Sequence, residues 1–226
     1  MKLNLNITPI EITNLSERKT YKIDKRLLFI LTGAFILATV VGTVSHECGH
    51  YLVARCLGFN ARINYMATWL TDIPNNRPLT RREGFLFTLG GPLETMLTGT
   101  IGLMFLFLYR KSYQTAQQLS FRQWTFIFIS LFWLRQTANL VVWFALYLIR
   151  GRFAGGGDEI FLSRMLHLPD FTLILGTGMI GAIVLAIVIF KFIPASQRLT
   201  FILSGILGGV AGYLLWLESL GKYIMP

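Results

Sequence analysis

The chain alternates long apolar runs with shorter polar segments. Five apolar runs are separated by segments that are rich in charged residues, proline or glycine. About 20 consecutive apolar residues are needed for a helix to cross the hydrocarbon core of a bilayer. We therefore expect about five transmembrane helices, at residues 27–57, 84–108, 124–149, 171–190 and 199–217.

The first run and the segment after it predict a long helix followed by a β-hairpin. Residues 27–57 contain no proline, so one helix is expected to continue as far as Gly58. In residues 61–70, Ile63, Tyr65 and Trp69 lie at alternating positions, which is typical of a strand or hairpin. The predicted fold class is an all-α polytopic membrane protein with a small β-hairpin between its first two helices.

The pattern also divides the chain into three units. Residues 1–26 are polar and of mixed charge, which indicates an extramembrane arm rather than a signal peptide. Residues 27–169 are expected to form a catalytic core of three transmembrane helices with their loops. Residues 170–226 are expected to form two glycine-rich packing helices, because the pairs Gly205/Gly209 and Gly208/Gly212 have the spacing that lets helix backbones approach closely in lipid.

Composition agrees with lipid as the surrounding solvent. Hydrophobic residues make up 54% of the 226 residues, charged residues 14%, and the mean hydropathy is +0.56. The net charge of +10 comes from basic residues between the apolar runs, where they can contact anionic headgroups. We expect an integral, multi-pass protein with membrane lipid as a partner and no nucleic acid. The basic residues divide almost evenly between the two sides, so they assign no orientation.

The candidate chemistry lies inside the first apolar run. His46-Glu47-Cys48-Gly49-His50 is an HExxH motif, and residues four apart share one face of a helix. His46 and His50 can therefore bind one metal ion, and Glu47 can take a proton from water at that ion. Ionisable groups at bilayer depth are costly unless they are paired or bound to a metal. The expected cofactor is Zn²⁺.

A third ligand must come from outside this helix, because a catalytic zinc usually has three protein ligands. Asp158 is the first choice, since it follows the glycine run 155–157 near the end of the third span. Glu159 and His167 remain alternatives. Asp158 also fits the N-cap of a helix at residues 159–166.

Three ordered features of the chain resemble the site-2 protease family of intramembrane zinc metalloproteases. They are the HExxH motif at 46–50 on a membrane helix, Gly91-Pro92 in the next span, and Asp158 near the end of the third. The chain departs from the family where Glu159 stands in place of a glycine and where Thr95 stands in place of a frequent asparagine.

The resemblance implies a function for the motif residues. His46, His50 and Asp158 would bind zinc, and Glu47 would be the general base. The expected reaction is hydrolysis of a peptide bond in a membrane-anchored protein, so the expected partner is a transmembrane protein or peptide substrate.

Polar residues elsewhere in the spans are candidates for holding that substrate. A helical peptide hides its amides, so a protease in the membrane needs groups that bind an opened strand. Gln136 and Asn139, together with Gly91 and Pro92, are the predicted substrate-binding residues. Arg135 and Glu94 are expected to form an ion pair between two helices.

Two other functions fit parts of the sequence. A metal-binding membrane scaffold that does not hydrolyse its client helices would need the histidines but tolerate the loss of Glu47. A transporter would line a pathway with the polar residues, but the spans have no obvious inverted repeat. Hydrolysis is the favoured interpretation.

Overall fold

The computed structural model describes residues 23–73 and 77–226, so most of the arm predicted at residues 1–26 lies outside the described residues. Within the described part, five helical segments are long and apolar enough to cross a membrane, which confirms the predicted fold class. These segments are Lys25–Cys56, Arg81–Leu108, Phe121–Arg150, Phe171–Phe192 and Ala195–Ile224.

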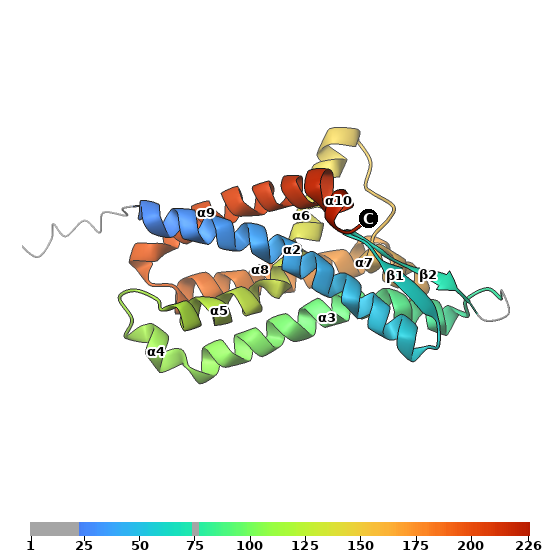
Figure 1. Cartoon of the computed structure of the whole chain (residues 1–226), viewed down its shortest axis with the longest axis horizontal. Helices are drawn as coiled ribbons and strands as arrows, with labels where there is room; N and C mark the ends of the chain where they lie inside the picture. Colours follow the sequence, from blue (N-terminus) through green and yellow to red (C-terminus); the bar gives the residue numbers. More distant parts are fainter. Residues whose placement is uncertain (1–22, 74–76) are drawn as a thin grey trace, which may run out of the picture.

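The elements are arranged as an elongated bundle with a small sheet at one end (Figure 1). In chain order they are α2 (Lys25–Cys56), β1 (Asn60–Ile63), β2 (Thr68–Asp72), α3 (Arg81–Leu108), α4 (Arg110–Gln114), α5 (Phe121–Ser130), the 3₁₀ turn η2 (Leu131–Trp133), α6 (Leu134–Arg150), α7 (Asp158–Met165), α8 (Phe171–Ile187), the π-helical turn η3 (Val188–Phe192), α9 (Ala195–Tyr213), the π-helical turn η4 (Leu214–Leu220) and α10 (Gly221–Ile224).

The helix α2 runs along the bundle and is followed directly by the hairpin. Its start is capped by Asp24, whose side chain accepts a hydrogen bond from the Leu27 amide at 3.0 Å. Gly58 has a φ of +82°, a left-handed conformation that ends the helix and turns the chain back. The strands β1 and β2 then pair antiparallel, with Ala61 opposite Leu70, which confirms the predicted hairpin.

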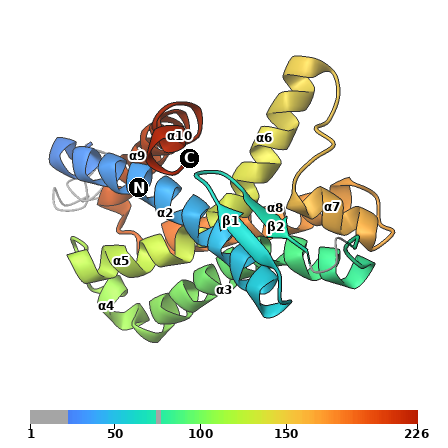
Figure 2. The same cartoon turned by 45° about the vertical axis from the view of Figure 1, so that its right-hand side comes forward.

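The second and third spans each contain an irregular feature. Pro92 lies inside α3, in the stretch where α3 packs closely on α2: a Cβ on Gly90 would lie only 2.7 Å from the carbonyl oxygen of Gly49. The third span is one continuous run in the sequence but is divided by the 3₁₀ turn η2. Beyond this turn, α6 diverges from the bundle (Figure 2), and Gly151, with a φ of +67°, ends it.

Close glycine packing also joins α9 to α2. A Cβ on Gly208 would lie 2.5 Å from the carbonyl oxygen of Thr32, and one on Gly212 would lie 2.6 Å from Thr39 Oγ1. Gly209, by contrast, has nothing within 4 Å of its Cβ position. The predicted packing role therefore applies to the Gly208/Gly212 pair, whereas Gly209 faces away from α2.

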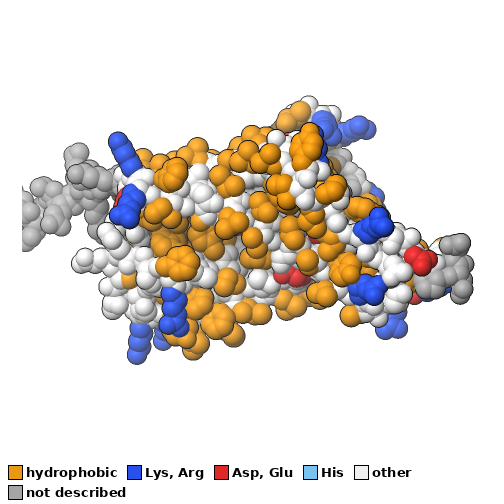
Figure 3. All heavy atoms as spheres, viewed as in Figure 1, with side chains coloured by type: hydrophobic (Ala, Val, Ile, Leu, Met, Phe, Trp, Pro, Cys, Tyr) orange, Lys and Arg blue, Asp and Glu red, His pale blue; other side chains and the backbone are white. Residues whose placement is uncertain are grey.

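The face of the molecule seen in Figure 3 is apolar along its middle and carries lysines and arginines toward both ends. Many large hydrophobic side chains of the bundle are exposed, among them Phe29, Leu108 and Leu148. This arrangement is consistent with a multi-pass membrane protein whose lysines and arginines reach the two interfaces.

The last described segment of the chain returns to the hairpin. Trp216 in η4 donates a hydrogen bond from Nε1 to the carbonyl oxygen of Tyr65 at 2.8 Å. The Tyr65 amide in turn donates to the carbonyl oxygen of Met225 at 2.9 Å. The turn of the hairpin is therefore held by residues from the opposite end of the described chain.

The ion pair expected between Arg135 and Glu94 does not form among the described residues. Glu94 instead accepts hydrogen bonds from the hydroxyls of Ser45, at 2.6 Å, and Thr98, at 2.9 Å. Hydroxyls on α2 and α3 thus donate to one carboxylate oxygen of Glu94, and Arg135 lies closer to Glu47.

Candidate metal centre

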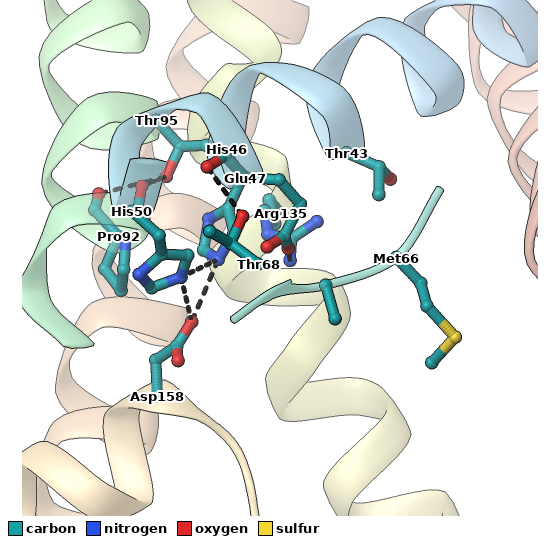
Figure 4. A network of polar contacts seen from close by, with 12 residues as sticks. Thr43, His46, Glu47, His50, Met66, Thr68, Pro92, Thr95, Arg135 and Asp158 are labelled. Carbon is teal, nitrogen blue, oxygen red and sulfur yellow. Dashed lines mark hydrogen bonds and ion pairs between the residues drawn. The ribbon is translucent and has the colours of Figure 1, made fainter. Parts of the chain in front are cut away.

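Two histidines of α2 and an aspartate that is distant from them in the sequence meet at one side of this helix (Figure 4). His46 and His50 lie one turn apart on this helix, both buried, with their Nε2 atoms 3.2 Å apart. Asp158 comes from the start of α7, and its Oδ2 atom lies 2.9 Å from His46 Nε2 and 3.3 Å from His50 Nε2. The structure therefore brings together the three residues that the sequence analysis selected as metal ligands.

The orientation of His50 is set by the main chain of α3. Its Nδ1 atom lies 2.7 Å from the carbonyl oxygen of Phe87, which can only accept a hydrogen bond. The proton of the neutral ring is therefore on Nδ1, and the lone pair of Nε2 points toward Asp158. Metal-binding histidines commonly have this arrangement, with the second ring nitrogen held by a carbonyl or carboxylate.

The residues fit a metal ion in both spacing and space. Ligand atoms at about 2.0–2.2 Å from a tetrahedral zinc lie roughly 3.3 Å from one another, and the three separations here are 2.9, 3.2 and 3.3 Å. Gly91 of α3 leaves room beside them, because a Cβ there would lie 2.5 Å from His46 Nε2. The group could hold a metal ion, and its two nitrogens and one carboxylate oxygen are ligands that zinc accepts.

Asp158 is placed by the turn before α7. Gly157 adopts a φ of +119°, which the other amino acids rarely adopt, and Asp158 is the first helical residue after it. The Asp158 side chain makes no capping hydrogen bond to α7, so the alternative N-cap role is not seen. Burial opposes ionisation of this carboxyl, but its contacts with the His46 and His50 imidazoles outweigh burial and hold the pKa of Asp158 below its usual range.

Glu47 opens onto a cavity shared with the three ligands. The cavity has a volume of about 500 Å³, and its walls come from α2, β2, α3, α6 and α7. Glu47 is only 4% exposed yet lies on the cavity wall. Thr68 of β2 donates a hydrogen bond to the Glu47 main-chain oxygen at 2.9 Å, which fastens the hairpin to the motif helix.

The alternative third ligands lie outside the three-residue cluster. Glu159 is buried and accepts a hydrogen bond from Asn139 Nδ2 at 3.2 Å. Burial raises the pKa of the Glu159 carboxyl above its usual value. His167 lies at the surface, with its Nε2 atom 2.6 Å from an Arg81 guanidinium nitrogen. Of the three candidates, the structure places only Asp158 beside the histidines.

The predicted substrate-binding residues are divided between the cavity and the helix interfaces. Asn139 lines the cavity. Gln136 is 1% exposed and donates a hydrogen bond to Thr95 Oγ1 at 3.3 Å, so it packs between α6 and α3. Gly91 lies against the histidines, and the Pro92 carbonyl oxygen accepts a hydrogen bond from Thr95.

Sequence reasoning missed three contributors to this site. The Phe87 carbonyl carries no sequence signal, since any residue has one. Thr68 belongs to the predicted hairpin, but its bond to α2 depends on how the hairpin folds back. Arg135 was noticed as a buried charge but assigned to the wrong partner; its Nη2 atom lies 4.0 Å from Glu47 Oε1.

Comparison of the chain with protein-family models, curated proteins and solved structures found no match in any of the three. A function must therefore be inferred from the site itself. Two buried histidines and a partly buried aspartate lie beside a glutamate and open to a cavity between apolar helices, an arrangement suited to metal-assisted hydrolysis.

Proposed function

We propose that this chain is an intramembrane zinc metalloprotease that hydrolyses a peptide bond in a membrane-anchored protein, as the site-2 proteases it resembles do. One observation carries the proposal. The Nε2 atoms of His46 and His50 and the Oδ2 atom of Asp158 converge within 3.3 Å of one another at a cavity that Glu47 also lines. A short motif occurs by chance, but this convergence requires a third residue 112 positions away from His46.

The metal ligands and Glu47 would have separate roles in the reaction. When zinc is held by His46, His50 and Asp158, it supplies a Lewis acid for the scissile carbonyl and makes water a stronger acid. Glu47 would accept one proton from the attacking water and give it to the amine as the C–N bond breaks. The oxygen of that water and its second proton remain in the new carboxyl group, so the atoms and charge balance without another reactant.

The surroundings of the site support a membrane-anchored peptide as the substrate. The apolar side chains of Val142, Leu146 and Phe161 line the same cavity as the polar group. An opened peptide strand needs hydrogen-bond partners there, and Asn139 and the strand β2 are on the cavity wall. In this proposal Asn139 binds the substrate main chain, while Gln136 helps to fix α6 against α3.

The direct test combines metal analysis with cleavage. Purified wild-type protein should hold about one zinc and cut a model transmembrane peptide, and His46→Ala, His50→Ala and Asp158→Ala should lose both properties. Glu47→Gln should keep the zinc and lose cleavage by several orders of magnitude.

Glu47→Gln also separates the protease from a metal-binding scaffold. If the variant retained full function in binding client helices, and wild-type protein cut no peptide, the scaffold would replace the protease. An active Glu47→Gln protein would eliminate the proposed mechanism.

A further inference from the structure

The polar wall of the cavity includes one residue without a role in the proposed mechanism. Arg135, Asn139 and Val142 lie on one face of α6 at a spacing of four and three residues, and all three line the cavity. Among the cavity-lining residues that the structure describes, Arg135 is the only lysine or arginine. It contributes a permanent positive charge beside the proposed zinc ligands.

Among the described residues, the N–H donors of the Arg135 guanidinium are not occupied by hydrogen bonds to the protein. It has five N–H donors, yet no hydrogen bond from it is found among the described residues, and its buried Nε atom lacks a partner. Its nearest carboxylate oxygen is Glu47 Oε1, 4.0 Å from Nη2. Burying an arginine with free donors at bilayer depth costs free energy unless a ligand supplies oxygen atoms that accept hydrogen bonds from it.

A purely structural ion pair would have a different geometry. Arg77 and Glu83 form two hydrogen bonds at 2.7 and 2.8 Å, and Arg164 and Asp170 form two at 2.6 and 2.9 Å. These pairs have the parallel, two-bond contact that arginine makes with a carboxylate. The separation of Arg135 from Glu47 leaves both groups facing the cavity.

We propose that Arg135 binds the carbonyl oxygen of the scissile peptide bond and stabilises the negative charge that develops on it. This inference rests on the proposed function. Because Arg135 lies next to Glu47, the oxygen it can reach belongs to the carbon that the water attacks. The oxygen gains charge as water adds and loses it when the C–N bond breaks. Arg135 donates hydrogen bonds throughout and transfers no proton.

The test uses two ligands that differ only at the scissile position. One is a phosphinic peptide with an amidated C-terminus, whose tetrahedral anionic group resembles the transition state. The other is the corresponding peptide with its neutral amide, measured on a Glu47→Gln background so that it is not cut. Binding to zinc-loaded protein is measured by calorimetry for wild type, Arg135→Gln, Arg135→Lys and the surface control Arg152→Gln.

Arg135→Gln should weaken binding of the phosphinic peptide by about 10²–10³-fold, the usual effect of removing one oxyanion donor. Binding of the neutral peptide and the zinc content should stay near the wild-type values, and kcat should fall with little change in KM. Arg135→Lys should recover part of the lost affinity, and Arg152→Gln should behave as wild type.

Two results would overturn the inference. Equal losses for both peptides, or loss of zinc in both Arg135 variants, would make Arg135 a structural residue. A wild-type protein that holds zinc but binds no phosphinic peptide would instead contradict the proposed function.

Discussion

Gly91 of α3 lies directly against His46 of α2, so closely that a Cβ on Gly91 would lie 2.5 Å from His46 Nε2. Gly91→Ala should therefore displace the imidazole and weaken zinc binding by roughly 10–100-fold, the range found when groups that orient metal ligands are changed. The measurement is a zinc titration of apoprotein in detergent. Gly84→Ala in the same helix is the control, because its nearest atom would be 3.6 Å away. Equal zinc affinity in the two variants would show that the space beside Gly91 is not needed.

The neighbouring acids Asp158 and Glu159 should behave differently when neutralised. Asp158→Asn should lower zinc affinity by about 100-fold or more, since it removes a charged ligand rather than an outer group. Glu159→Gln should leave the stoichiometry near one, because Glu159 accepts from Asn139 and lies outside the ligand group. Metal analysis after gel filtration measures both. If Glu159→Gln lost zinc and Asp158→Asn kept it, Glu159 would be the third ligand instead of Asp158.

Adjacent glycines in α9 should differ in stability. Gly208→Ala should destabilise the fold by about 1–3 kcal/mol, since its Cβ would press on Thr32 and Phe35 of α2. Gly209→Ala should be neutral or slightly stabilising, because its Cβ would meet open space. Thermal unfolding in detergent compares the two. If both variants unfold at the same temperature, the close α2–α9 contact is not as described.

The contact between Trp216 and the hairpin should be measurable by hydrogen exchange. Trp216→Phe keeps the ring but removes the donor to the Tyr65 carbonyl, at a cost of about 1 kcal/mol. The amide of Tyr65, which bonds to Met225, should then exchange several-fold faster. Trp69→Phe, at an exposed position of β2, serves as the control. Unchanged exchange at Tyr65 would show that Trp216 does not hold the hairpin.

Much of the fold could be predicted because lipid imposes a length and a polarity on every span. The second span was expected at residues 84–108 and begins at Arg81 in the structure, since the Thr80 and Glu83 capping box adds a turn outside the apolar run. The 3₁₀ turn at Leu131–Trp133 was not expected, because no proline or glycine marks it in the sequence.

The site was predictable only where residue type and spacing define it. The motif placed two imidazoles on one face, and the glycine run directed attention to Asp158. The Phe87 carbonyl and the open position of Arg135 depend on how α3 and α6 pack, which no local pattern records. Arg135 and Glu94 were expected to pair as opposite charges in neighbouring spans, but Glu94 accepts hydrogen bonds from the hydroxyls of Ser45 and Thr98 instead.

The bond between Trp216 and Tyr65 joins residues 151 positions apart. During synthesis the HExxH helix and its hairpin are made early, whereas the partners that fix the hairpin turn are made more than a hundred residues later. Met66 and Ala67, the turn residues that follow Tyr65 and line the cavity, therefore gain this support only after η4 has been made. A newly made chain therefore has all three proposed metal ligands before it has the contacts that hold the hairpin turn beside them.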